Sequence, residues 1–256
     1  MLLAIDAGNT HTVFGLFDGR NMEALWRIGT RKELTSDELG AWVRLLLGDA
    51  GFNSSDIDGV IACSVVPDMN TVLTDTSRVC FGRAPLFIGP GIRTGMKIRY
   101  ENPHEVGADR IVNAVAAKER LGAPVMVLDF GTATTLDVVD EDGEYLGGVI
   151  APGLEISAEA LFEKAARLSR VDIRRPDRAI GRTTEDSIRS GLFFGYASLV
   201  EGVIRRAREE LGQDAPVIAT GGLAPVFEGE IGIIKDIVPG LTLEGLRIIW
   251  EKNHKR

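Results

Sequence analysis

The chain has 256 residues, 45% of them hydrophobic, and a formal net charge of -8. That length suits one large domain or two modest ones with a real core. An acidic balance argues against a nucleic-acid binder, because phosphate contacts require a basic face. No apolar run is long enough to span a bilayer, and residues 1–5 lack the basic start of a signal peptide. We therefore expect a cytoplasmic protein with no nucleic-acid or membrane partner.

The chain has two cysteines, Cys63 and Cys80, and their spacing matches no metal-binding motif. Cys63 lies in the apolar run "GVIACSVV", which predicts a buried strand. We interpret it as a reduced thiol of the core, as expected in a reducing compartment.

Short strand-like runs alternate with longer helical patterns in the first half of the chain. In the first predicted helix, Ser36 is a candidate cap and Leu39, Val43, Leu46 and Leu47 share one face. This alternation is typical of an α/β protein. The predicted strands are residues 2–6, 12–17, 57–66 and 84–89, and the predicted helices are residues 35–51, 69–82 and 107–122.

The pattern then restarts. Residues 124–148 predict a strand, a glycine loop, a second strand, a turn and a third strand. Further on, the sequence predicts helices over residues 153–168 and 189–212, a strand running into a glycine turn over 216–224, and a final helix with a basic tail over 242–256.

This restart repeats a short motif. An apolar run, Asp, any residue and Gly, followed by Thr, occurs at Asp6 in "AIDAGNT" and at Asp129 in "VLDFGTATT". Each copy ends a predicted buried strand, opens a hairpin and is followed by a "DG" turn. Because the offset is about half the chain, we predict two similar lobes, residues 1–117 and 118–256.

The two hairpins suggest phosphate chemistry, although the P-loop pattern GxxxxGK[ST] is absent. Small residues at a tight bend let backbone amides approach phosphate oxygens, and threonine hydroxyls add donors. The aspartates would instead hold a cation, or its waters, that bridges to the phosphates. We therefore expect an ATP tail held in a cleft between the lobes, since phosphoryl transfer needs mainly positioning and charge neutralisation.

Two further segments complete this hypothesis. The "TGG" of residues 220–222 is either a third close-approach site, for the nucleoside, or an ordinary turn between a strand and a helix. Asp109 and Arg110 begin a predicted helix, where they either interact with its dipole or bind an acceptor. In the second case Asp109 takes a proton from a hydroxyl and Arg110 holds a carboxylate.

Six segments together resemble the type III pantothenate kinases, which belong to the acetate and sugar kinase, heat-shock protein 70 and actin superfamily. They are "DAGNTHTVFGLF", "YENPHEVGADRIVNA", "LDFGTATTLD", "GGVIAPG", "GRTTEDSIRSG" and "TGGLA". The resemblance covers residues 3–253 and implies two lobes of the actin-like, ribonuclease H-like ATPase fold, each a mixed sheet flanked by helices. It implies ATP-dependent phosphorylation of pantothenate to 4'-phosphopantothenate, the first step of coenzyme A biosynthesis.

The resemblance also implies roles for individual residues. It assigns the ATP phosphates and adenosine to Asp6, Ala7, Gly8, Asn9, Thr10, His11, Thr12, Val13, Gly131, Thr132, Gly221 and Gly222. It assigns pantothenate to Tyr100, Gly107, Ala108, Asp109, Arg110 and Thr184, with Asp109 as the catalytic base. Asp6 would organise Mg²⁺ through water, and Asp129 would bind a monovalent cation, K⁺ or NH₄⁺.

The resemblance further implies a homodimer, with the dimerisation surface in the second lobe. Two positions depart from the family pattern: Thr183 replaces a frequent Asn, and Ser169 a frequent Pro. The residues leave two alternatives open. One is a kinase of the same fold for another small hydroxy acid, and the other is a non-catalytic ATP-binding regulator.

Overall fold

The computed structural model describes residues 1–164 and 170–254. Contacts divide the chain into two units. The first contains Met1–Met96, Glu101–Ala116 and Gly240–Arg256, and the second contains Lys97–Tyr100 and Ala117–Pro239. The predicted lobe boundary after residue 117 falls beside one of these breaks. The last helix, however, belongs to the first unit and not, as predicted, to the second.

The first unit is built on a mixed sheet in which β1 pairs antiparallel with β2 and parallel with β4. Its strand order is β3-β2-β1-β4-β5. The strands are β1 (Leu2–Ala7), β2 (His11–Asp18), β3 (Asn21–Gly29), β4 (Gly59–Ser64) and β5 (Leu86–Phe87).

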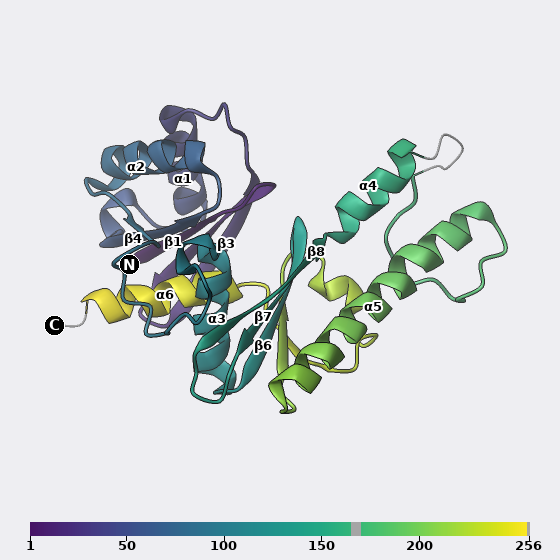
Figure 1. Cartoon of the computed structure of the whole chain (residues 1–256). Coiled ribbons are helices and arrows are strands. Elements are labelled where there is room, and N and C mark those ends of the chain that lie inside the picture. The colour runs from purple at the N-terminus through teal and green to yellow at the C-terminus, as the bar shows by residue number, and fades with distance from the viewer. Residues whose placement is uncertain (165–169, 255–256) are drawn as a thin grey trace. The chain divides into compact units, whose positions relative to one another are not determined.

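Helices cover both faces of this sheet (Figure 1). The helices α1 (Ser36–Asp49) and α2 (Pro67–Phe81) pack on one face, and α6 (Leu241–His254) packs on the other. The helix α3 (Ala108–Leu121) and the short 3₁₀ turns η1 (Ser54–Asp56) and η2 (Pro103–Glu105) complete the elements that begin in this unit.

Glycines in two strands let α6 approach the sheet closely. A Cβ at Gly59 would lie 2.3 Å from the Trp250 ring, and one at Gly15 would lie 2.9 Å from Leu243 Cδ1. Any side chain at Gly59 would therefore displace the Trp250 ring from its place against the sheet.

The cap of helix α1 lies one residue earlier than the sequence suggested. Thr35, not Ser36, is its cap, because the Thr35 hydroxyl accepts a hydrogen bond from Glu38 N while the Glu38 carboxylate accepts one from Thr35 N. This reciprocal arrangement is a capping box, which satisfies two backbone donors at the helix start.

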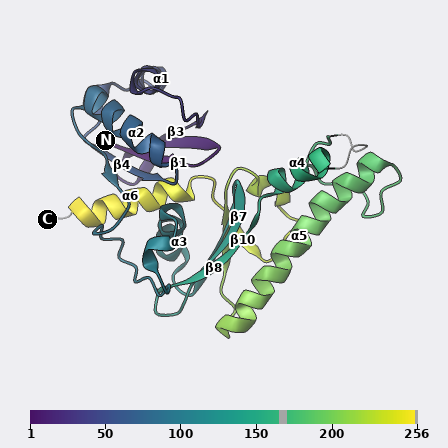
Figure 2. The same cartoon turned by 45° about the horizontal axis from the view of Figure 1, so that its top comes forward.

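The second unit repeats the plan of the first. Counted from β8, its order β8-β7-β6-β9-β10 matches β3-β2-β1-β4-β5 strand for strand. Figure 2 shows α4 and α5 on the same side of this sheet. The elements are β6 (Val125–Phe130), β7 (Ala133–Val139), β8 (Tyr145–Pro152), α4 (Leu154–Lys164), α5 (Thr184–Leu211), β9 (Val217–Thr220), η3 (Ala224–Phe227) and β10 (Ile234–Ile237).

The predicted internal repeat is therefore confirmed, and so is the fold class of two mixed sheets flanked by helices. The strands β3 and β10 were missed, and α5 begins at Thr184 instead of residue 189. The end of the helix predicted over 153–168, and the departure at Ser169, lie outside the described residues. No helix in the described part of the chain is long and apolar enough to cross a membrane.

Candidate active site

Asp6 lies near the end of β1, directly between Val13 of β2 and Cys63 of β4 in the sheet register. The Cys63 thiol donates a hydrogen bond to Asp6 Oδ1 at 3.1 Å. Burial, reinforced by nearby Asp109, raises the pKa of Asp6 to about 6, although the Cys63 hydrogen bond and the charge of Arg27 act in the opposite direction. A thiol is a weak donor, so within residues 1–164 and 170–254 the carboxylate has no strong hydrogen-bond donor.

Cys63 is buried, as predicted, and burial raises the pKa of its thiol. Its position beside Asp6 was not foreseen. The thiol stays neutral and therefore serves as a hydrogen-bond donor to the carboxylate rather than as a nucleophile.

The bend between β1 and β2 is fixed by Thr30, a residue that the sequence analysis missed. The Thr30 hydroxyl donates to Gly8 O at 2.7 Å and pairs with the Thr12 hydroxyl at 2.9 Å, while Thr30 N donates to Thr10 O at 2.9 Å. Within the bend, Gly8 N donates to His11 O at 3.0 Å. These bonds hold the loop while Asn9, Thr10 and His11 remain exposed to a ligand.

Asp109 and Arg110 stand in the first turn of α3, in the same unit as Asp6. Asp109 Oδ1 accepts a hydrogen bond from Arg110 N at 2.9 Å. Burial raises the pKa of Asp109, and its interactions with Arg110 oppose that change. The charge of Asp109 raises the pKa of Asp6, so the predicted catalytic carboxylate lies within electrostatic reach of the predicted cation-binding one.

Gly107 is required beside Asp109. A Cβ at this position would lie 2.5 Å from Asp109 Oδ1, so any side chain would displace the carboxylate. Within the predicted segment 107–110, the absence of a side chain at Gly107 thus leaves space for the Asp109 carboxylate.

The second hairpin has the same construction. Asp129 lies opposite Thr135 of β7 and beside Thr220 of β9, the position that Cys63 occupies in the first unit. Gly131 N donates to Ala133 O at 3.1 Å, which closes the bend as Gly8 does in the other hairpin.

Two oxygen atoms converge beside Gly221, whose φ is 94°. A Cβ there would lie 2.5 Å from both Asp129 Oδ1 and Phe130 O. A carboxylate and a carbonyl oxygen are donors suited to a hard cation. Gly221 is the predicted adenosine residue, and the structure brings it to Asp129; Gly222 follows it in the same turn.

Gly153 and Tyr196 brace the second hairpin, and neither was predicted as a site residue. A Cβ at Gly153 would lie 2.1 Å from Thr132 O, and the Gly153 amide donates to that oxygen at 3.2 Å. The Tyr196 hydroxyl donates to Pro152 O at 2.9 Å and pairs with Thr134. The "APG" sequence was the only local sign of this close approach.

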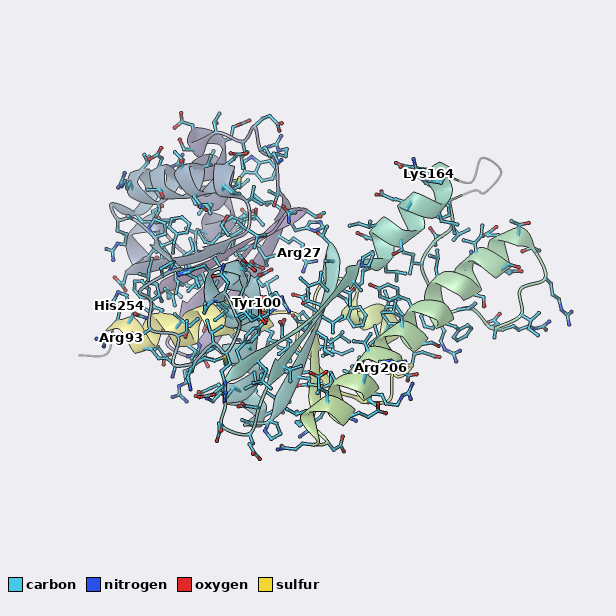
Figure 3. The ribbon with its side chains drawn as sticks, in the orientation of Figure 1. Arg27, Arg93, Tyr100, Lys164, Arg206 and His254 are labelled. Atoms are coloured by element: carbon cyan, nitrogen blue, oxygen red, sulfur yellow. The ribbon has the colours of Figure 1, made fainter. Side chains whose placement is uncertain are left out.

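The predicted pantothenate residues are divided between the units. Gly107, Ala108, Asp109 and Arg110 belong to the first, whereas Tyr100 and Thr184 belong to the second. The Tyr100 ring, labelled in Figure 3, lies against Gly147, where its Cε2 would be 3.2 Å from a Cβ. No hydrogen bond joins Tyr100 to Thr184 among the described residues.

Thr184 is the first residue of α5, and Thr183 caps that helix by accepting a hydrogen bond from Asp186 N at 3.1 Å. Threonine and asparagine are both favoured helix caps. The departure from the family pattern at Thr183 therefore preserves the cap.

Among the described residues, no group of three or more His, Cys, Asp or Glu side chains is arranged to bind a metal ion. Mg²⁺ commonly keeps its waters and is held by one or two carboxylates plus substrate phosphates. Asp6, with its raised pKa and weak donor, fits that arrangement, and Asp129 with the Phe130 carbonyl fits a monovalent cation.

The sequence matches the family model described as Pan_kinase, type III pantothenate kinase, over residues 2–206. A type III pantothenate kinase of Koribacter versatilis is 50% identical, with 99% of this chain and 96% of the relative covered. One from Moorella thermoacetica is also 50% identical, covering 99% of this chain and 100% of the relative.

The chain belongs to the type III pantothenate kinase family. Solved structures of similar proteins share only low sequence identity with this chain, so they support its fold and not its function. One described as a putative Baf family transcriptional activator from Campylobacter jejuni has a TM-score of 0.61 at 17% identity, covering 98% of both chains. A ROK hexokinase from Thermus thermophilus has a TM-score of 0.54 at 17% identity, covering 97% of both chains.

Proposed function

We propose that this type III pantothenate kinase transfers the γ-phosphoryl group of ATP to the hydroxyl of pantothenate, giving 4'-phosphopantothenate and ADP. The observation that carries the proposal is the pair of partly buried carboxylates, Asp6 and Asp109, close enough to raise the pKa of Asp6. Such a pair suits a site that binds a cation with one carboxylate and accepts a proton with the other.

In the proposed reaction the pantothenate hydroxyl oxygen forms a bond to the γ-phosphorus. The bond from that phosphorus to its bridging oxygen breaks, and its electron pair leaves with ADP. Asp109 orients the hydroxyl and accepts its proton. Mg²⁺ bound with ATP neutralises phosphate charge and would be organised by Asp6. The exposed bend at Asn9, Thr10 and His11 offers donors to the phosphates.

The remaining roles follow from the local structure. Arg110 is a bidentate partner for the pantothenate carboxylate, and Tyr100 and Thr184 contribute further substrate contacts. Gly131 and Thr132 bind the nucleotide phosphates, and Gly221 and Gly222 bind the adenosine. Asp129 and the Phe130 carbonyl hold K⁺ or NH₄⁺. A cytoplasmic location also remains part of the proposal.

A homodimer is supported by an apolar surface on the second unit. The strand β8 is at the edge of its sheet, where Ile150 is 64% exposed. On the face of β8 opposite to Ile150, an apolar groove is lined by residues of β6, β7, β8 and α5, including Val149, Leu199 and Val203. Exposed apolar edges are usually covered in solution. We expect light scattering to give twice the chain mass, and Ile150→Glu to reduce it.

A coupled assay of ADP release tests the function. The protein is incubated with Mg²⁺ and ATP, with and without pantothenate and with a short panel of other hydroxy acids. Release that requires pantothenate supports the proposal. Release with another acid and not with pantothenate identifies a different kinase, and ATP binding with no release in any mixture identifies a non-catalytic regulator.

A further inference from the structure

Arg27 lies in the same row across the first sheet as Asp6. In the register, Arg27 of β3 is opposite Val13 of β2, Val13 is opposite Asp6 of β1, and Asp6 is beside Cys63 of β4. Residues directly opposite one another in neighbouring strands point to the same face of a sheet. Arg27 therefore shares the face of Asp6.

The neighbouring rows confirm which face this is. Ile5, Phe14 and Trp26 form the adjacent row, and they pack in the core with α1 and α2. One row further, Leu25 packs beside Gly240, at the start of α6. Since side chains alternate along each strand, Arg27 is on the side opposite to α1 and α2.

Arg27 is an exposed cation close to an anionic site. Among the described residues it forms no ion pair and no hydrogen bond, but its charge lowers the pKa of Asp6. Figure 3 labels the Arg27 side chain on β3. A guanidinium with no bonded anion, on the face that carries Asp6, is available to an anion brought by a ligand.

Neutralising the charge of the Asp6 carboxylate does not by itself explain an arginine at position 27. Two strand spacings of about 4.7–4.9 Å separate their backbones, with Val13 between, and exposed pairs at such separations contribute little. Val13 is the last residue of the predicted ATP hairpin. An ATP tail bound over this hairpin would lie between Arg27 and the carboxylates and would satisfy the guanidinium directly.

We propose that Arg27 contacts the phosphate tail of ATP, donating its guanidinium N–H groups to non-bridging oxygens of the β- or γ-phosphoryl group. This inference rests on the proposed kinase function. Arg27 gives up no proton, and its charge stabilises the negative charge that shifts toward the β–γ bridging oxygen during transfer. It would make Arg27 a further catalytic residue from a strand outside the recognised motifs.

The test compares Arg27→Met and Arg27→Lys with Arg20→Met, a matched control. Arg20 is an exposed arginine in the turn between β2 and β3, at the far end of the same hairpin. Steady-state kinetics with varied ATP are measured, together with calorimetric binding of ADP and of a non-hydrolysable ATP analogue. Thermal melts check folding, and we expect wild-type melting temperatures because both positions are exposed.

We expect Arg27→Met to lower kcat/KM for ATP by roughly 100-fold or more, with the KM for pantothenate unchanged. In Arg27→Met the binding preference for the ATP analogue over ADP should disappear. Arg27→Lys should restore part of the kcat/KM for ATP and part of this binding preference. Arg20→Met should match the wild type in both quantities. An Arg27→Met variant within about threefold of Arg20→Met in kinetics and binding overturns the inference. If the wild type lacks pantothenate-dependent ADP release, the proposed function fails, whereas the nucleotide-binding comparison still decides the role of Arg27.

Discussion

Replacing Asp6 with Asn should stabilise the ligand-free protein while removing its activity. Burial raises the pKa of Asp6 from 3.8 to about 6, so the folded state holds the proton more tightly than the unfolded state. The resulting stability is fully present below pH 3.8 and is lost as the pH rises through about 6.

At about 1.36 kcal/mol per pH unit, the difference between the two pKa values corresponds to at most about 3 kcal/mol. This is an upper limit, because Asp6 is partly exposed to water. Asparagine keeps the oxygen that accepts the Cys63 hydrogen bond but carries no charge. In a chain of this size, each kcal/mol raises the melting temperature by roughly 2–4 °C.

Melting temperatures are measured by circular dichroism from pH 4 to pH 8 without ligand. Asp18→Asn, which removes an exposed carboxylate at the end of β2, is the control and should have no effect. The gain from Asp6→Asn should be largest above pH 6 and shrink toward pH 4. A variant that melts at or below the wild-type temperature at pH 8, or whose gain is independent of pH, refutes the reasoning. Added Mg²⁺ and ATP should stabilise only the wild type.

Three further variants test the other roles. Asp109→Asn should lower kcat by roughly 100-fold or more while calorimetry shows ATP binding retained; near-normal turnover would leave Asp109 with only a helix-dipole role. Asp129→Asn should abolish the dependence of activity on K⁺, and an unchanged K⁺ titration curve would remove that assignment. Gly221→Ala should weaken nucleotide binding at least tenfold, because φ is 94° and a Cβ would meet Asp129 Oδ1; wild-type affinity would show that the turn adapts.

The features that the sequence predicted are local ones. The hairpins at Asp6 and Asp129 were recognisable because each combines a buried strand, a glycine bend and a turn within a short stretch. The role proposed for Asp109 comes from its place in a segment typical of the family, and it stays a prediction. The missed strand β3 alternates regularly between exposed and half-buried residues, so its pattern was present but was not used.

The features that the sequence did not reveal depend on register between distant strands. Arg27 shares a row with Asp6 only because β2 lies between their strands, and Cys63 meets Asp6 only through the parallel pairing of β4. Likewise, Thr30 reaches Gly8 from the end of the next strand. Spacing along the chain contains no information on such pairs, because a shift of one residue would send each side chain to the opposite face.

The packing of α6 on the first sheet has a consequence for biosynthesis. Trp250 fills the space left by Gly59, so the core of the first unit is completed by a segment that is translated after the whole of the second unit. Residues 117–239 form an unbroken stretch of the second unit and can fold while the ribosome is still adding α6. The first unit is thus completed after the second, and loss of residues from α6 would damage the unit that begins the chain before the unit in its middle.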